Sequence, residues 1–234
     1  FDGHASVGDV LARGAVGAIV EHGFAGSEEQ APAYEAQRAR FREQAPAYAG
    51  RRAGPDLWTR RLIEVPDTLE ALQRLAHRVR SAVSTRVIAI TGSAGKTTTK
   101  EAIAALLATR FRVVKNKGNL NNHIGLPLSL MQLRTAPDVA VMELGMNHAG
   151  EISALVAIAE PDVRVWTNVG DAHLGFFASS DAIADAKAEI LERANASTVL
   201  VCNADDPRVV ARVGGFAGRT ITFGVSASAD VRAG

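Results

Sequence analysis

One stretch, Arg86–Lys100 (RVIAITGSAGKTTTK), constrains the fold of this chain more than any other segment. It opens with the apolar run Val87–Ile90, which is typical of a buried strand, and the residues after Lys96 favour a helix. Between them, Gly92 and Gly95 let the backbone take positive φ and approach a ligand closely. The stretch therefore predicts a strand, a tight glycine turn and a helix in direct succession.

The residues of this turn suit a phosphate group. The turn points successive backbone N–H groups at one spot, beside a helix N-terminus that carries partial positive charge. Lys96 adds a full positive charge, and the hydroxyl of Thr97 can ligate Mg²⁺. A glycine turn before a helix with a solvated lysine is the competing interpretation. We favour a nucleoside triphosphate site because strand, turn, lysine, threonine and helix occur together.

The spacing of the turn differs from that of the common P-loop. That motif, G-x-x-x-x-G-K-[ST], would need its first glycine where Ile90 stands. The chain instead has the shorter T-G-S-A-G-K-T-T over Thr91–Thr98.

Composition argues against several classes of protein. With 234 residues, of which 47% are hydrophobic, the chain can bury a sizeable core in one or two domains. A net charge of +1 gives no reason to expect nucleic acid or an acidic membrane surface as a partner. No window approaches the ~20 apolar residues of a membrane helix, and no signal peptide is visible. The single cysteine, Cys202, cannot form an internal disulfide, so we expect a cytoplasmic protein.

The first 83 residues predict part of a small α/β domain. Because the chain starts at Phe1 without Met, and stops in a polar stretch, we expect a piece of a longer protein, truncated at both ends. A domain boundary is expected near Ser81–Thr85. The elements expected before it are a helix near Ser6–Arg13, strands at Gly17–Val20 and Leu62–Val65, and a helix from Asp67 or Thr68 to about Val83.

An insertion, Gly23–Arg61, interrupts this first domain. It is rich in Ala, Arg, Gln and Glu and contains QAPAY twice, at Gln30–Tyr34 and Gln44–Tyr48. Two copies are too few for a solenoid. Its arginines could form a basic patch for a phosphorylated ligand or a partner. We favour the alternative, a solvated and partly helical insertion.

From Arg86 onward, strands and helices alternate. This alternation predicts an α/β fold with a mostly parallel sheet and helices on both faces. Right-handed crossovers would bring the carboxyl ends of the strands to one edge, where open α/β sheets bind ligands. The expected strands are Val87–Ile90, Arg112–Lys115, Asp138–Leu144, Val163–Thr167, Thr198–Cys202 and Thr220–Phe223, and the expected helices are about Thr97–Thr109, Leu126–Leu133, Glu151–Ala159 and Asp181–Ala194.

Polar residues follow the predicted strands at that edge. Glu143 ends an apolar strand, where a carboxylate is costly to bury unless it is paired or bound to a metal. With Thr97 it could complete an oxygen-rich Mg²⁺ site, and a salt bridge to Lys96 is the alternative. His173 is a weaker candidate for a second metal ligand. The other polar residues of this edge are Lys117, Asn119, Asn121, Asn122, Asn147, His148, Asn168, Asp171, Asn203, Asp205 and Asp206.

Lys187 occupies an unexpected place on its helix. It follows Ile183 by four residues and precedes Ile190 by three, so it shares their inward apolar stripe. A lysine there either extends its ammonium to solvent or reaches a negative partner, and the spacing alone leaves both open.

Four blocks of the sequence carry a family resemblance. They are TGSAGKTT, GNLNNHIGLPLSL at Gly118–Leu130, ELGMNHAGEI at Glu143–Ile152, and NVGDAHLGFF with DAKAEIL at Asn168–Phe177 and Asp185–Leu191. Together they resemble the Mur ligases, the ATP-dependent amide-forming enzymes of peptidoglycan precursor synthesis. The first block is shared with folylpolyglutamate synthetases. The other three resemble the members that add D-alanyl-D-alanine, and FDGHASVGDVLARGAVGAIVE resembles the end of the family's UDP-binding domain.

The resemblance implies a role for each matching residue. Lys96 and the loop (Gly92, Ser93, Ala94, Gly95, Thr97 and Thr98) would hold the β- and γ-phosphates of ATP. Thr97 and Glu143 would hold one Mg²⁺, and His173 would help to hold a second, together with a carbamylated Lys187. Carbamylation would make that inward lysine the negative group that a metal requires. Asn119, Asn121 and Asn122 would face the nucleotide phosphates or substrate, and Asn203 would reach the adenine.

The implied reaction joins small molecules in two steps. ATP phosphorylates the terminal carboxylate of UDP-MurNAc-tripeptide, and the amine of D-Ala-D-Ala then attacks the acyl phosphate through a tetrahedral intermediate. Catalysis would be mostly positioning and charge neutralisation, with Lys96, His173 and Lys187 as catalytic residues. We expect a monomer. The resemblance also implies a C-terminal ligase domain beyond Gly234, so these 234 residues alone are expected not to ligate.

Three alternatives remain open. The chain could be another Mur-type or polyglutamate-adding ligase, although ELGMNHAGEI argues against this. It could be a P-loop ATPase that hydrolyses without ligating, which would need a water-positioning residue but no acceptor carboxylate. It could also be a nucleotide-binding module without turnover.

Overall fold

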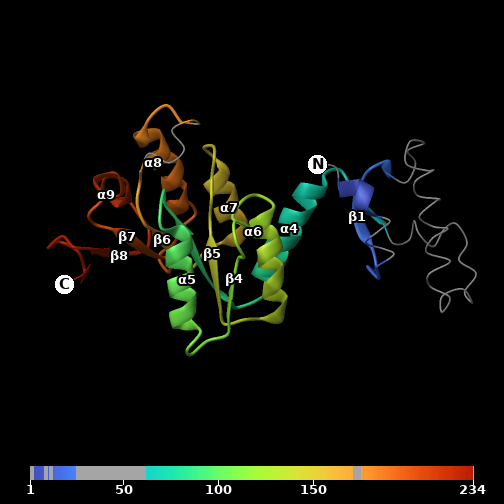
Figure 1. The fold of residues 1–234 in the computed structure, drawn as a ribbon, viewed down its shortest axis with the longest axis horizontal. Helices are drawn as coiled ribbons and strands as arrows, with labels where there is room; N and C mark the ends of the chain where they lie inside the picture. The colour runs from blue at the N-terminus through green and yellow to red at the C-terminus, as the bar shows by residue number, and fades with distance from the viewer. Residues whose placement is uncertain are drawn as a thin grey trace, which may run out of the picture. The chain divides into compact units, whose positions relative to one another are not determined.

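The computed structural model describes residues 3–7, 10, 13–24, 62–170, 175 and 177–233 (Figure 1). The chain forms two compact units, Phe1–Ala71 and Leu72–Gly234. Apart from Gly23 and Phe24, the predicted insertion lies outside the described residues, so both interpretations of it stay untested. The predicted domain boundary near Ser81–Thr85 also stays a prediction.

The first unit contains a short pair of parallel strands. Val7 and Val20 are buried and form a small core with Phe24. The helix predicted near Ser6–Arg13 lies partly outside the described residues. The elements of this unit are a 3-10 helix η1 (Gly3–Ser6), β1 (Ala18–Glu21), β2 (Leu62–Val65) and the start of α4 (Thr68–Ser81).

The second unit is built on a seven-stranded sheet in the order β4-β5-β3-β6-β7-β8-β9. Every neighbouring pair is parallel, which confirms the predicted α/β fold and brings the carboxyl ends of the strands to one edge. Because β3 lies between β5 and β6, the loop after β3 leaves the sheet at a topological switch point. The strands are β3 (Arg86–Thr91), β4 (Val113–Lys115), β5 (Val139–Glu143), β6 (Val163–Trp166), β7 (Val199–Asn203), β8 (Arg219–Gly224) and β9 (Val231–Arg232).

Helices connect these strands. No helix among the described residues combines the length and the apolarity needed to cross a membrane. The helices that connect the strands are α5 (Lys96–Leu107), α6 (Gly125–Leu130), α7 (Glu151–Ala159), α8 (Ser180–Ala188) and α9 (Pro207–Val213), with 3-10 turns η4 (Met131–Thr135) and η5 (Glu189–Leu191).

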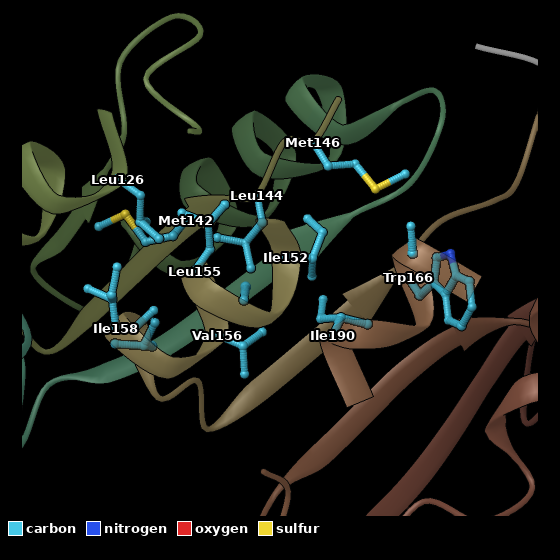
Figure 2. Close-up of a cluster of buried hydrophobic side chains, with 14 of the residues drawn as sticks. Leu126, Met142, Leu144, Met146, Ile152, Leu155, Val156, Ile158, Trp166 and Ile190 are labelled. Atoms are coloured by element: carbon cyan, nitrogen blue, oxygen red, sulfur yellow. The ribbon is translucent and has the colours of Figure 1, made fainter. Parts of the chain in front are cut away.

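Alternate residues of each strand face opposite sides of the sheet. On β3, Val87 joins a large core, whereas Ile90 joins a smaller one that includes Ala104 of α5. Figure 2 shows the large core, where Met142 of β5 packs near Leu126 of α6 and side chains of α7. Helices therefore cover both faces, as predicted.

Two helices end earlier than predicted. The prediction Leu126–Leu133 corresponds to α6 followed by η4, and the prediction Asp181–Ala194 ends at η5. Arg164, buried on β6, explains the second difference. Its guanidinium donates to the carbonyl oxygens of Ile190 and Glu192, so these carbonyls do not continue the helix.

The sequence prediction lacks α9 and β9. Asp206 is the N-cap of α9, accepting hydrogen bonds from the N–H groups of Arg208 and Val209, with Pro207 in the first turn. The strand β9 lies in the polar stretch that ends the chain, Ser226–Gly234, where the sequence predicts a loop, and it pairs with β8.

Candidate functional site

The glycine turn lies between the end of β3 and the start of α5. Gly92 has φ of 151° and Gly95 has φ of 78°, so both adopt the region that favours glycine. A Cβ on Gly92 would lie 1.9 Å from Oγ1 of Thr167, which leaves no room for a side chain. No side chain caps α5 at Gly95, so this helix end keeps its partial positive charge for an anion.

The segment after β6 holds the turn in shape. Oδ1 of Asn168 accepts from the N–H of Ala94 at 2.9 Å, and Nδ2 of Asn168 donates to the Ala94 carbonyl at 3.1 Å. Ser93 donates its N–H to the Asn168 carbonyl at 3.0 Å and its hydroxyl to the Gly170 carbonyl at 3.0 Å. The sequence placed Asn168 at this edge without assigning it a role, and the structure makes it the residue that braces the turn.

Lys96 folds back over the turn. Its Nζ donates to the carbonyl oxygens of Gly92 at 2.8 Å and Ser93 at 3.4 Å. Burial lowers the pKa of Lys96, and the nearby Glu143 carboxylate opposes that shift. Because carbonyls satisfy the ammonium only in part, it can turn towards a phosphate that enters the loop.

Glu143, at the end of β5, faces the first turn of α5. Its side chain is 4% exposed. Oε2 accepts from the Thr97 hydroxyl at 2.8 Å, and Oε1 accepts from Nδ2 of Asn121 at 2.9 Å. Among the described residues, the ion pair of Glu143 is with Lys100 at 3.9 Å, rather than with Lys96 as the alternative interpretation of the sequence proposed. Thr97 and Glu143 thus bring two oxygen donors together.

Two buried residues behind Glu143 were missed by sequence reasoning. Asn116 accepts from the backbone N–H of Glu143 at 3.0 Å and donates to its carbonyl at 3.1 Å. Lys100 donates to the Asn116 carbonyl at 3.0 Å. No signal in the local sequence marks either residue, because each is defined by a partner from another strand or helix.

A cleft of about 280 Å³ opens beside these residues. It brings together five of the residues that the resemblance singled out, from three separate blocks. Gly145 permits this packing, because a Cβ there would lie 2.8 Å from the side chain of Asn121. The lining residues are Lys96, Asn119, Asn121, Asn122, His123, Gly145, Met146, Asn147, Glu151 and Lys187.

Lys187 points inward and does not extend to solvent. It is 1% exposed, and no described residue accepts a hydrogen bond from its Nζ. Burial, with a smaller contribution from the charge of Lys96, lowers the pKa of Lys187 to about 8. A buried amine with a lowered pKa in a ligand cleft is a candidate for chemistry.

Glu189, just beyond Lys187, ties α8 to α7. Its carboxylate accepts from the N–H of Gly150 at 2.6 Å and from the N–H of Ser153 at 3.0 Å, which caps the N-terminus of α7. This contact fixes the segment that carries Lys187 against the segment that carries Glu151, on the rim of the same cleft.

The remaining candidates either do not line the cleft or fall outside the part of the chain that the structure describes. His173 and Asp171 fall outside the described residues. Asn203 accepts from the N–H of Asp205 at 2.8 Å and does not line the cleft. Asp205 accepts from the N–H groups of Val225 and Ser226, and Asp206 caps α9, so these two carboxylates hold backbone.

The donor set fits a hard divalent cation. Among the described residues, no group of three or more His, Cys, Asp or Glu side chains gathers as a complete metal cage. Mg²⁺ is commonly held by one or two protein oxygens together with substrate phosphates and water. The Glu143 carboxylate and the Thr97 hydroxyl, beside the glycine turn, match the protein part of that pattern.

Comparison with known proteins places this site in a family. The family model described as "Mur ligase middle domain" matches residues 90–234. The UDP-N-acetylmuramoyl-tripeptide–D-alanyl-D-alanine ligase of Bacillus subtilis is 47% identical over 146 residues, which are 62% of this chain and 32% of that protein. The enzyme of the same name from Synechocystis is 34% identical over 226 residues, 96% of this chain and 43% of that protein.

A solved structure extends the match. The MurF ligase of Thermotoga maritima, in complex with ADP, has a TM-score of 0.75 and 31% identity over 97% of this chain and 45% of its own. The chain thus spans between about a third and a half of the length of these relatives. Because the family model matches more than half of its residues, this chain belongs to the Mur ligase family.

Proposed function

We propose that the protein is an ATP-dependent amide ligase that adds D-alanyl-D-alanine to UDP-N-acetylmuramoyl-tripeptide in peptidoglycan precursor synthesis. One observation carries the proposal: Lys96 of the glycine turn and the buried Lys187 line one cleft, and the Thr97–Glu143 pair is joined to it by the hydrogen bond from Asn121, which also lines the cleft. The names of the relatives supply the substrates. We also propose that the protein is cytoplasmic and monomeric. Residues 1–83 would form part of a domain that binds the UDP-linked substrate, and residues 84–234 would form part of the ATP-binding domain.

The turn and Lys96 bind the nucleotide. The free N–H groups at the start of α5 and the Lys96 ammonium hold the β- and γ-phosphates, and they stabilise charge that builds up on the transferred group. Thr97 and Glu143 would hold Mg²⁺, which neutralises phosphate charge when it is bound.

The cleft positions the acceptor. A substrate carboxylate attacks the γ-phosphorus while the bond to the ADP oxygen breaks, which gives an acyl phosphate and ADP. The amine then attacks the acyl carbon, phosphate leaves, and the nitrogen loses a proton. Amide side chains from Asn119, Asn121 and Asn122 line the cleft and can orient these polar groups.

Lys187 would take part after modification. We propose that it carries a carbamate, because a lysine amine reacts with CO₂ in its neutral form and burial already favours that form. The carbamate oxygens would then face the cleft and, together with a ring nitrogen of His173, would bind a second Mg²⁺.

A competition between amines tests the substrate assignment. The full-length protein is given ATP, Mg²⁺ and UDP-MurNAc-tripeptide with D-alanyl-D-alanine and L-glutamate in equal amounts, and products are identified by mass spectrometry. The proposal expects the D-alanyl-D-alanine amide as the main product. A glutamate adduct would instead assign a polyglutamate-type ligase, and free phosphate without any amide would assign an ATPase.

A further inference from the structure

Lys100 is a fully buried lysine that the proposed reaction does not use. It stands one turn after Thr97 on α5, so the two side chains share a face of that helix. Its exposed fraction is 1%, as low as that of Lys187. Moving an ammonium group out of water costs several kcal/mol unless partners compensate for it, so its contacts need a reason.

The contacts of Lys100 lead to the metal-binding carboxylate. Nζ donates to the Asn116 carbonyl at 3.0 Å and lies 3.9 Å from Oε2 of Glu143. On the outer side, it lies 3.6 Å from Oε1 of Glu101, which also pairs with Lys115. Alternating charges thus run inward from the surface, from Lys115 through Glu101 and Lys100 to Glu143.

Asn116 completes the arrangement. It is fully buried, and its amide binds both backbone groups of Glu143 at 3.0 and 3.1 Å. Lys100 therefore restrains Glu143 twice: directly through the carboxylate, and indirectly through the carbonyl of the residue that grips its backbone. The same Oε2 atom accepts the Thr97 hydroxyl.

We propose that Lys100 is a positioning residue that keeps the Glu143 carboxylate aimed at Thr97, so that the cation site is formed before the metal–nucleotide complex arrives. The inference rests on the proposed nucleotide site. Lys100 itself does not line the cleft. Its charge compensates the buried Glu143 carboxylate, and its hydrogen bond holds the Asn116 carbonyl in place. Together with the hydrogen bonds from Thr97 and Asn121, these contacts favour one rotamer of Glu143.

Metal dependence of ADP binding tests this role without catalysis. ADP affinity of the full-length protein is measured calorimetrically across a Mg²⁺ titration and in EDTA, and Mn²⁺ EPR reports the cation directly. The variants are Lys100→Met, Lys100→Arg and Lys115→Met, the last of which breaks the outer ion pair only. If Lys100→Met does not fold, Lys100→Gln replaces it, because it is neutral but can still donate a hydrogen bond.

The expected result is a rise of tenfold or more in the Mg²⁺ concentration for half-maximal ADP binding by Lys100→Met, with affinity in EDTA changed less than twofold. Lys100→Arg recovers part of the loss, and Lys115→Met matches the wild type. An unchanged or lower Mg²⁺ requirement in folded Lys100→Met would overturn the role of Lys100. Absence of ADP binding by the wild type would instead overturn the proposed function.

Discussion

The hydroxyl of Thr97 donates a hydrogen bond to Oε2 of Glu143 at 2.8 Å, joining the first turn of α5 to the end of β5. The two residues are 46 positions apart in the chain. Parallel pairing of β3 with β5 brings them together, with Ile90 opposite Glu143 in the register. The sheet thus sets two oxygen ligands beside the glycine turn between β3 and α5.

Removal of the Thr97 hydroxyl should weaken cation binding while the protein still folds. Thr97→Val keeps the shape of the side chain but leaves Glu143 without this donor, so we expect at least a tenfold loss of Mg²⁺-dependent ADP affinity. Thr97→Ser retains the hydroxyl and should stay within about threefold of the wild type. Equal behaviour of the two variants in calorimetry would show that the hydroxyl is not a ligand.

Gly92 and Gly95 should differ in their tolerance of alanine. Both have positive φ, but only a Cβ on Gly92 meets an obstacle, whereas nothing lies within 4 Å of one on Gly95. Gly92→Ala should lower the free energy of unfolding by about 2–4 kcal/mol, because backbone strain and a steric clash add. Gly95→Ala should cost about 1 kcal/mol. Urea denaturation compares them, and equal costs would contradict the close approach of Thr167 to Gly92.

The buried ammonium of Lys187 should make stability depend on pH. Its pKa is lowered from 10.5 to about 8, so the folded state holds the proton less tightly than the unfolded state. The penalty is complete below pH 8 and disappears as the pH rises from about 8 to 10.5. In CO₂-free buffer, the wild type should therefore gain up to about 3 kcal/mol relative to Lys187→Met over that range. Parallel pH profiles of the two proteins would refute this.

Arg80 should stabilise the second unit through the end of α7. Its guanidinium donates to the carbonyls of Ala159 at 2.8 Å and Glu160 at 2.9 Å and pairs with Asp162 at 3.0 Å. Arg80→Met should lower the free energy of unfolding by about 2–4 kcal/mol, because the buried Ala159 carbonyl loses its donor and the carbonyl of Glu160 and the Asp162 carboxylate lose the guanidinium as well. The exposed Arg78 on the same helix is the control, and Arg78→Met should cost less than about 0.5 kcal/mol. Similar losses in both would argue against the cap.

The sequence predicts the fold well because its signals are local. Apolar runs, glycines and helical stripes sufficed for the parallel sheet. The stripe of Ile183 and Ile190 put Lys187 on the inward face of its helix but left open whether its ammonium reaches solvent, and the structure buries it. The N-cap and proline signals of Asp206 and Pro207 were present, so α9 could have been found. The early end of α8 could not, because Arg164 comes from a distant strand.

Within the site, single residues were easier to predict than their partners. Glu143 stands out as a carboxylate at the end of an apolar strand. Lys100 and Asn116 look like ordinary polar residues in the sequence. The packing of α5 against β5 buries Lys100 beside Glu143, and the pairing of β4 with β5 brings in Asn116, which follows β4. Local patterns thus locate a site, whereas tertiary contacts decide which groups support it.

Phosphate release tests the central claim most directly. The full-length protein is supplied with ATP and Mg²⁺, and UDP-MurNAc-tripeptide and D-alanyl-D-alanine are added separately and together. A ligase should release phosphate in sustained turnover only when both are present, and Lys96→Ala should abolish the release. Release that is indifferent to both substrates would contradict ligation and leave a nucleotide-hydrolysing site with a different acceptor.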